Sequence, residues 1–302
     1  MRVLITGGSG SLGHQLAEQY MGKWDMIVFS RDEFKQSQMH SKYPEFSYVI
    51  GDVRDKYSLR SAFRVHKPEF VIHAAAMKRI EVCEANPWQA IQTEVLGAKN
   101  VLDVCHEFGV PVVGVSTDKA VKPVNTYGIS KALQEKLFIN AGFNCVRYGN
   151  VIGSRGSVIP MFHKLVAQGK PLTITNPDMT RFLMKLEEAV GLIDKAMKSE
   201  PNGHVFVKKS PACTVGDLAA CFSADVRVVG ERPGEKLHEL LVSEDEMPKT
   251  VEEDGHFIVT PKHQGGKRWE YGSHNTDRLT QARIKELIGE WLPGSQTVPS
   301  EI

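Results

Sequence analysis

This sequence has no large excess of charge of one sign, no long apolar run and no cluster of metal ligands, and each absence excludes a class of function. The 302 residues carry 37 Lys and Arg against 36 Asp and Glu, which gives a formal net charge of +1. A chain so balanced lacks the sustained positive field that attracts nucleic acid. No apolar stretch approaches the ~20 residues that span a bilayer. We therefore expect neither nucleic-acid binding nor membrane insertion.

Cysteine is sparse as well. The five cysteines are an odd number, and no two of them form a C-x-x-C pair. The 11 histidines are scattered and include no H-E-x-x-H motif. Free, buried thiols in a reducing compartment are the simplest interpretation, and we expect no metal site. Because no signal peptide precedes the first predicted strand, we expect a cytoplasmic protein.

Glycine, in contrast, is concentrated near the N-terminus. An apolar run at 2–6 leads directly into Gly7-Gly8-Ser9-Gly10-Ser11-Leu12-Gly13, and a helical pattern follows. The glycines fit both G-x-G-x-x-G and T-G-x-x-G-x-x-G, and their place between a first strand and a first helix predicts a dinucleotide-binding loop rather than a mere tight turn. Such a loop brings helix N–H groups to a pyrophosphate. The expected contacts are Gly7, Ser9, Gly10, Ser11, Leu12 and Gly13.

The residues after the second predicted strand bear on the identity of the dinucleotide. That strand covers 26–30, and Ser30 and Arg31 stand at its end. A carboxylate at this position would hold the ribose 2′-OH of NAD. A hydroxyl and a guanidinium suit the 2′-phosphate of NADP better. Asp32 and Glu33 come next, so NADP is favoured and NAD is the second choice.

Two further strand ends are expected beside the cofactor. A strand at 46–50 is followed by Asp52 and Val53, and Asp52 would accept a hydrogen bond from the adenine amino group. The alternative is that Asp52 caps a helix at 57–65. A fourth strand, predicted at 70–76, ends in Ala74, Ala75 and Ala76, whose small side chains would let the backbone lie against the cofactor. Close packing of a helix on the strand would also require alanines.

The most informative stretch combines Asp118 and Lys119 with Tyr127 and Lys131. On a helix, Tyr127 and Lys131 lie one turn apart on one face. An ammonium beside a phenol favours the phenolate, so Tyr127 is a candidate base near neutral pH. Asp118 and Lys119 follow a buried apolar run at 110–115, which places them at the carboxyl end of a strand, where open α/β sheets bind ligands. The alternative is an ordinary helix-face pair and solvated surface charge.

The order of predicted elements indicates an α/β fold with two parts. Strands and helices alternate up to about Tyr148, which predicts a Rossmann-type, doubly wound parallel sheet. We expect residues 1–150 to form the cofactor-binding domain and residues 151–302 to form a smaller substrate domain. A predicted strand near 203–209 would return to the main sheet, so the two domains would interleave. The tail at 292–299 is expected to lack regular structure.

Several motifs together resemble one family. The chain is similar to the extended short-chain dehydrogenase/reductases and, within them, to the UDP-N-acetylglucosamine 4,6-dehydratases of capsule, flagellin-glycan and pseudaminic-acid pathways. Beside the glycine loop and Tyr-x-x-x-Lys, the resemblance rests on five segments in the expected order. They are Ser30-Arg31-Asp32-Glu33, Ser116-Thr117-Asp118-Lys119-Ala120, Arg147-Tyr148-Gly149-Asn150-Val151, Thr180-Arg181-Phe182 and Arg232-Pro233-Gly234-Glu235-Lys236.

The resemblance implies an NADP-dependent 4,6-dehydratase of UDP-N-acetylglucosamine. Tyr127, with Lys131, would take the proton from the sugar 4-OH while the C4 hydride goes to NADP⁺. Lys119 would remove the C5 proton, Asp118 would protonate the departing 6-OH, and the hydride would return to C6. The product would be a UDP-4-keto-6-deoxy sugar. A tyrosine at position 127 resembles the branch that inverts C5.

The resemblance also implies a set of UDP-sugar contacts and a homo-oligomer. The implied contacts are Lys78, Asn150, Arg155, Ser157, Arg181, Arg232 and Glu235. For each arginine, the alternative is a surface ion pair. A long helix between about 88 and 108 would supply a subunit interface, although core packing explains its apolar face equally well. Two other functions stay open: a UDP-hexose 4-epimerase, and a non-catalytic protein that senses a dinucleotide.

Overall fold

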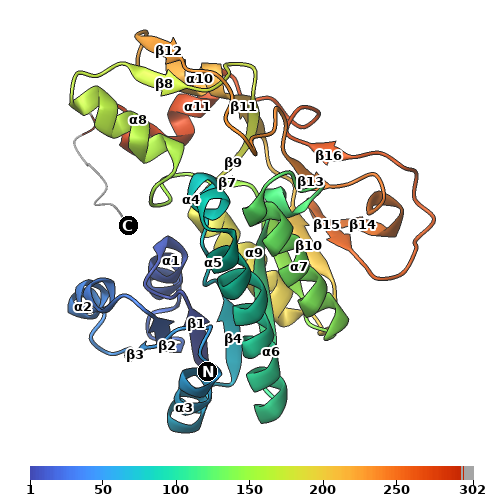
Figure 1. The fold of residues 1–302 in the computed structure, drawn as a ribbon. Helices are drawn as coiled ribbons and strands as arrows, with labels where there is room; N and C mark the ends of the chain where they lie inside the picture. The colour runs from blue at the N-terminus through green and yellow to red at the C-terminus, as the bar shows by residue number, and fades with distance from the viewer. Residues whose placement is uncertain (294, 296–302) are drawn as a thin grey trace.

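A nine-stranded sheet organises the chain, and its first six strands follow the Rossmann order. The computed structural model describes residues 1–293 and 295 (Figure 1). The sheet order is β14-β15-β10-β6-β5-β4-β1-β2-β3. The six parallel strands of the first half are β1 (Arg2–Thr6), β2 (Asp25–Ser30), β3 (Ser47–Ile50), β4 (Phe70–His73), β5 (Val112–Thr117) and β6 (Cys145–Tyr148). The expected Rossmann-type α/β fold is therefore confirmed.

Helices cover both faces of this sheet, so its strands are apolar on both sides. Leu4 of β1 packs in a core with Phe63 and Leu102, whereas its neighbours Val3 and Ile5 pack in the opposite layer. This burial on both faces explains the continuous apolar run that begins the sequence. The helices of this half are α1 (Ser11–Tyr20), α2 (Glu33–Lys42), α3 (Lys56–His66), α4 (Ile80–Ala85), α5 (Pro87–Ala90), α6 (Gly97–Phe108) and α7 (Thr126–Asn140).

The helix expected at about 88–108 is interrupted. A π-helical segment, η1 (Ile91–Leu96), joins α5 to α6. A 3₁₀ turn, η2 (Asp118–Ala120), follows β5 directly. The periodicity of apolar residues predicts the long helix, but it does not reveal the wider π turn within that helix.

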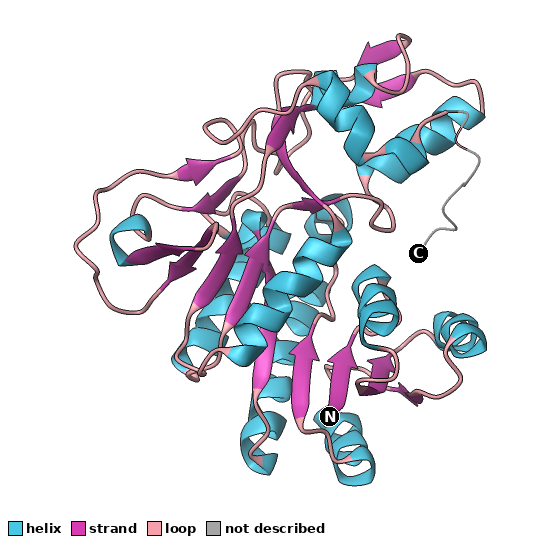
Figure 2. Cartoon of the chain, turned by 180° about the vertical axis from the view of Figure 1, so that it is seen from behind, coloured by secondary structure: helices cyan, strands magenta, loops and turns pink. Residues whose placement is uncertain are grey.

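The second half builds a smaller layer over the carboxyl ends of the parallel strands. The arrowheads of those strands point toward it in Figure 2. A third hydrophobic core, which includes Phe162, Leu218 and Ile284, holds it together. Its elements are β7 (Asn150–Val151), α8 (Val158–Ala167), β8 (Leu172–Ile174), β9 (Thr180–Met184), β11 (Ala212–Thr214), α10 (Val215–Ala220), β12 (Val226–Val228), β13 (Leu240–Val242), β16 (Tyr271–Gly272), α11 (Gln281–Leu287) and η4 (Gly289–Trp291).

Three strands from beyond residue 150 join the main sheet, and one helix packs on it. The strand β10 (Val205–Lys208) pairs in parallel with β6, and β15 (His256–Val259) and β14 (Thr250–Glu253) extend the edge in antiparallel fashion. The helix α9 (Leu186–Lys198) packs on β5 and β6. A short 3₁₀ turn, η3 (Met247–Lys249), precedes β14. We therefore propose a cofactor-binding half that contains these elements as well as residues 1–150.

Local structure corrects two details. β4 ends at His73 rather than at residue 76, because the N–H of Ala74 makes the last ladder bond to the Thr6 carbonyl and the N–H of Ala75 donates to the Thr6 hydroxyl instead. α3 is capped by Asp55, whose carboxylate accepts from the Tyr57 N–H, so the alternative role of Asp52 as a helix cap is wrong.

No helix among residues 1–293 is long and apolar enough to cross a membrane. Of the tail at 292–299, residues 294 and 296–299 lie outside the described residues.

Candidate active site

The glycine loop forms a bare cradle between β1 and α1. Gly7 has a φ of +69°, and a Cβ added there would lie 2.8 Å from the Ala75 Cα. A Cβ on Gly13 would lie 1.7 Å from the Gly8 carbonyl oxygen. Gly10 precedes α1 without a side-chain cap, so the first N–H groups of the helix point into the cradle. These features fit a dinucleotide pyrophosphate, which needs close backbone approach and free N–H donors.

Two guanidinium groups stand beside the end of β2. Arg31 NH1 lies 3.7 Å from Asp52 Oδ2, and Arg54 donates to the same oxygen through Nε at 2.9 Å and NH2 at 2.6 Å. One carboxylate thus faces two cations, which leaves this corner positive. The sequence interpretation missed Arg54, although its position two residues after Asp52 was a usable signal. The Ser30 hydroxyl is already bonded to Ser9 Oγ and Gln36 Nε2, each at 2.9 Å.

The segment after β4 lies against the glycine loop. The N–H groups of Ala74 and Ala75 donate to Thr6 Oγ1 at 3.2 and 3.3 Å. Ala76 is exposed. The Val53 side chain belongs to the hydrophobic core instead, so Val53 would meet a cofactor only through its backbone. Small residues at this crossing therefore serve both close packing and access for a ligand.

The four candidate catalytic residues converge at the carboxyl end of β5. Asp118 is fully buried in η2, and its Oδ1 accepts from Lys119 Nζ at 3.0 Å. Tyr127 and Lys131 lie one turn apart near the start of α7. Gly128 permits this approach, because a Cβ there would lie 2.3 Å from the Lys119 carbonyl oxygen. Asp118 and Lys119 thus lie at the same place in the fold as Tyr127 and Lys131.

The phenol of Tyr127 departs from the expectation. The Lys131 ammonium donates to the Val115 carbonyl and to Gln134 Oε1, both at 2.6 Å. Burial and then the Glu94 carboxylate raise the pKa of Tyr127 well above its usual value. The expected pKa near neutrality is therefore wrong for the surroundings that the protein itself supplies. A cationic ligand beside the ring would be needed to favour the phenolate.

A second carboxylate and a second amine adjoin Lys119, and the sequence interpretation missed both. Glu239 Oε1 lies 3.7 Å from Lys119 Nζ, and Glu239 Oε2 lies 3.6 Å from Lys236 Nζ. Burial alone would lower the pKa of Lys119, but the carboxylates of Asp118 and Glu239 raise it. Lys236 belongs to the Arg-Pro-Gly-Glu-Lys motif, so the motif could have predicted it as a site residue. No local signal marks Glu239.

Several polar atoms in this region are buried without a hydrogen-bond partner. Such atoms are few in folded proteins, and their presence here indicates a ligand-binding site. Asp118 Oδ2 and Glu239 Oε2 are two of them. Asn150 Oδ1 and Ser157 Oγ, both predicted substrate contacts, are two more. Each such atom costs roughly 1–3 kcal/mol when left unpaired. A polar ligand that meets them would remove this cost.

The predicted arginines approach the site from different elements. Arg181 of β9 donates to the carbonyls of Thr180 and Leu237, and no ion pair joins it to a carboxylate among residues 1–293. The Arg155 N–H donates to Ser11 Oγ at 3.1 Å, which places this loop over the glycine cradle. Burial and then the Arg155 charge lower the pKa of Lys78.

The loop that carries Arg232 and Glu235 is anchored beside Tyr127. The Asn125 side chain, which caps α7, donates to the Gly234 carbonyl at 2.7 Å. Lys236 Nζ donates to the Val121 carbonyl at 2.7 Å. Glu235 Oε2 accepts from the Arg232 N–H at 3.0 Å, so one of its oxygens is engaged within the loop. A motif about a hundred residues from Tyr127 in the chain is thus brought to the same site.

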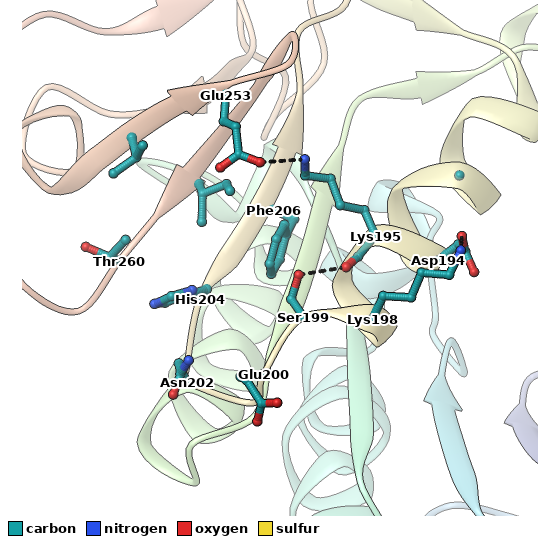
Figure 3. Close-up of a pocket in the computed structure, with 13 residues that line it drawn as sticks. Asp194, Lys195, Lys198, Ser199, Glu200, Asn202, His204, Phe206, Glu253 and Thr260 are labelled. Carbon is teal, nitrogen blue, oxygen red and sulfur yellow. Dashed lines mark hydrogen bonds and ion pairs between the residues drawn. The ribbon is translucent and has the colours of Figure 1, made fainter.

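A separate pocket lies between α9 and the β10, β14 and β15 strands (Figure 3). Its wall includes Phe206 within β10, and His204 and Thr260 at the amino end of that strand, away from Asp118, which follows the carboxyl end of β5. Lys195 crosses it to pair with Glu253 at 3.2 Å. None of the predicted site residues lines this pocket. We therefore place the site at the carboxyl ends of the strands.

The arrangement as a whole combines two kinds of chemistry. A phenol beside a dinucleotide cradle is equipped for proton transfer coupled to a redox step. The amine of Lys119 and the carboxyl of Asp118, 3.0 Å apart, add a base and an acid that a simple redox step does not require. Arg181 and Arg232 would supply positive charge for an anionic substrate group.

Comparisons with known proteins show what this chain is similar to. A family profile described as polysaccharide biosynthesis protein matches residues 3–261. A UDP-N-acetylglucosamine 4,6-dehydratase (inverting) of Campylobacter jejuni subsp. jejuni serotype O:2 is 42% identical over 277 residues, which cover 86% of this chain and 82% of that protein. A UDP-glucose 4-epimerase of Rickettsia canadensis is 42% identical over 325 residues, which cover 95% of this chain and 94% of that protein.

A solved structure is similar over nearly the whole chain. Pen from Bacillus thuringiensis has a TM-score of 0.89 and 32% sequence identity, and the match covers 96% of this chain and 97% of that chain. The two relatives above have the same identity to this chain, 42%, but differ in the reaction that they are named for. The residues of the site must therefore decide between dehydration and epimerisation.

Proposed function

Because the chain belongs to the polysaccharide biosynthesis protein family of the extended short-chain dehydrogenase/reductases, we propose that it is an NADP-dependent 4,6-dehydratase of UDP-N-acetylglucosamine. The observation that carries the proposal is the pair Asp118 and Lys119, which faces the same site as Tyr127 and Lys131. A 4-epimerase needs only the hydride shuttle. Elimination of water from C5 and C6 needs a further base and a further acid.

The redox half of the reaction would use the phenol. A bound, oxidised nicotinamide dinucleotide would accept the C4 hydride and later return it to C6, and its positive ring would favour the Tyr127 phenolate. Tyr127 would accept the proton of the sugar 4-OH, with Lys131 one helical turn away. The resulting 4-ketone acidifies the C5 proton. Gly7 and Gly13 would let the loop fold tightly beneath the pyrophosphate, since a side chain at either position would collide with the protein's own backbone.

The elimination half would use the pair after β5. Transfer of one proton from Lys119 to Asp118, across 3.0 Å, produces a neutral amine and a carboxylic acid together. The amine would then remove the C5 proton, and the acid would protonate the departing 6-OH, which leaves as water. Afterwards Lys119 is again an ammonium and Asp118 a carboxylate, so the pair is ready for another cycle. C5 would then take a proton from the opposite face, from the Tyr127 phenol that holds the former 4-OH proton, which inverts C5 and returns Tyr127 to the phenolate.

The substrate would be held by groups from several elements. Arg181 and Arg232 would pair with the UDP diphosphate, Asn150 Oδ1 and Ser157 Oγ would gain partners, and Glu235 would accept from a ribose hydroxyl. Lys78 and Arg155 lie nearer the glycine cradle and would meet the sugar or a phosphate there. A free enzyme of this kind would work in the cytoplasm, where nucleotide sugars are made.

One experiment tests the reaction and its stereochemistry. The full chain is incubated with NADP⁺ and UDP-N-acetylglucosamine in D₂O, with mass analysis and early NMR sampling. We expect loss of one water, a deuterium at C5 and the L-arabino 4-keto sugar. A new isomer that keeps its 6-OH would instead make the protein a 4-epimerase. A bound dinucleotide with no turnover of UDP-N-acetylglucosamine or UDP-glucose would indicate a sensor. A C5 deuterium with the D-xylo configuration would reject inversion alone.

The preference for NADP rests on the positive corner at Arg31 and Arg54. Replacing Arg31 with Ala removes a guanidinium that would pair with the 2′-phosphate, and it should weaken NADP binding about tenfold or more. NAD, which lacks that phosphate, should bind almost unchanged. Isothermal titration with both dinucleotides measures the two effects. Arg60→Ala, at an exposed pair with Glu107, is the matched control. Equal losses for both dinucleotides would remove the basis for NADP selectivity.

We also propose a homo-oligomer. Exposed apolar side chains gather on two neighbouring helical segments, at Trp88, Ile91 and Leu96 on one and Ile129 and Leu133 on the other. A second copy of the chain would cover this face and remove it from water. Sedimentation over a range of protein concentrations tests this, and a monomer throughout would contradict it.

A further inference from the structure

Glu94 is a fully buried carboxylate in the π-helical segment η1. π turns within helices are rare and occur often at functional sites. Glu94 Oε1 accepts from the Met77 N–H, in the loop after β4. Glu94 Oε2 has no hydrogen-bond partner and lies 3.6 Å from Lys131 Nζ. A buried carboxylate with one unpaired oxygen needs a charge partner, and Lys131 is the one that it faces.

Lys131 has equal need of Glu94. Its ammonium carries three N–H donors, and two of them meet neutral oxygens, the Val115 carbonyl and Gln134 Oε1. Its side chain is 3% exposed. Burial lowers the pKa of Lys131, and the Glu94 carboxylate is the largest influence that raises it. Without that carboxylate, burial would favour the neutral amine.

Other groups around this pair do not replace Glu94. Glu135 is committed to Arg147 and to the Ser116 hydroxyl. His73 is buried, and burial holds its pKa at about 3, so it stays neutral. The remaining titratable groups that face Lys131 or Glu94 carry no negative charge near neutral pH, since burial raises the pKa of each. They are Tyr127, Cys83 and Cys145.

We propose that Glu94 is a positioning residue, the counter-ion that keeps Lys131 charged beside Tyr127 and that ties this charge to the loop after β4. This inference rests on the proposed role of Tyr127 and Lys131 in proton transfer. The tether to Met77 places the neighbouring Lys78 relative to the same site. Glu94 itself touches no reacting atom. It acts through the ammonium of Lys131 and through the Met77 amide.

The direct test is an NMR titration of Lys131 in the protein without added cofactor. With [ε-¹³C]lysine, the Lys131 signal is assigned by its loss in Lys131→Arg. In Glu94→Gln the transition should move to lower pH by about one unit or more, because the stabilising negative charge is lost. Glu81→Gln, at an exposed pair with Arg79 on α4, should leave it unchanged. An unchanged Lys131 titration in Glu94→Gln would overturn the proposal.

Activity supplies a second readout with a fixed sign. A lower pKa for Lys131 means that the ammonium is lost earlier as pH rises, so the basic limb of kcat/KM should begin at lower pH in Glu94→Gln. Glu94→Asp keeps the charge and should restore most of the wild-type profile, and it serves as the test variant if Glu94→Gln does not fold. Failure of the wild-type protein to dehydrate UDP-N-acetylglucosamine would reject the proposed function, while the NMR titration would still decide the role of Glu94.

Discussion

Replacing Tyr127 with Phe is expected to lower the formation of product from UDP-N-acetylglucosamine by about a hundredfold to ten-thousandfold. The phenol oxygen is the proton acceptor for the 4-OH, and oxidation at C4 is the first step of the proposed sequence. Phe keeps the ring that packs with Cys83 and Ala90 while it removes only the oxygen. No reduced cofactor should accumulate in this variant, since the hydride would not leave C4.

Lys119→Ala is the informative contrast. Lys119 acts after oxidation, so this variant should still oxidise C4 but should fail to remove the C5 proton. Reduced cofactor would then build up on the enzyme, visible by its near-ultraviolet absorbance and fluorescence in a single-turnover mixture. The two variants therefore differ in the step that they block, although both lack product. Circular dichroism and thermal melting establish that both are folded.

Two outcomes would contradict this division of roles. Normal water loss by Lys119→Ala would remove Lys119 as the base for C5. Accumulation of reduced cofactor in Tyr127→Phe would show that another group accepts the 4-OH proton.

Because the pKa of Tyr127 is raised by burial and by Glu94, the wild-type rate of C4 oxidation at low cofactor occupancy should increase as pH rises.

Local motifs made much of the site predictable. The glycine loop lies within seven residues, and Tyr127 and Lys131 are one helical turn apart, so chain connectivity alone brings their groups together. The residues that were missed reach the site through tertiary packing. Glu239 approaches because Asn125 anchors the loop at Gly234. Nothing in the sequence near Glu239 encodes that contact.

Glu94 shows a different limit of sequence patterns. It follows Gln92 and Thr93 in a predicted helix, where polar residues usually face water. The π turn of η1 rotates it inward to Lys131, and apolar periodicity does not contain that rotation. β4 likewise ends early, where the Ala75 N–H leaves the ladder and donates to the Thr6 hydroxyl. In each case a specific long-range contact overrides the local preference.

Arg147 is the second residue whose loss should have a large effect, here on stability. It is a polar interruption in an apolar strand and is 1% exposed. Its guanidinium makes five hydrogen bonds: to Glu135 Oε1 and Oε2, to Glu246 Oε1 at 2.7 Å and Oε2 at 3.0 Å, and to the Leu241 carbonyl at 2.7 Å. It thus joins β6 and the helix α7 to β13 and to the segment after it. All five of its donors are satisfied.

Arg147→Met should lower the free energy of unfolding by about 3–5 kcal/mol, because it strands the carboxylates of Glu135 and Glu246 without a cation. Urea unfolding monitored by circular dichroism measures the loss. The exposed pair of Arg268 and Asp245 offers a matched control, since Arg268→Met should leave the urea midpoint unchanged. An Arg147→Met protein as stable as the wild type would mean that neighbouring groups or water already compensate both carboxylates.

The acid dependence of stability separates a charge effect from a packing effect in the same variant. Burial would raise the pKa of Glu246, but the charge and hydrogen bonds of Arg147 lower it to about 2. A carboxyl whose pKa is depressed on folding contributes stability above its unfolded pKa, near 4.5, and loses it as pH falls toward 2. The wild type should therefore lose stability steeply over that range. Arg147→Met, which has already lost the ion pair, should lose much less there, whereas a simple packing defect would leave the acid dependence of the wild type intact.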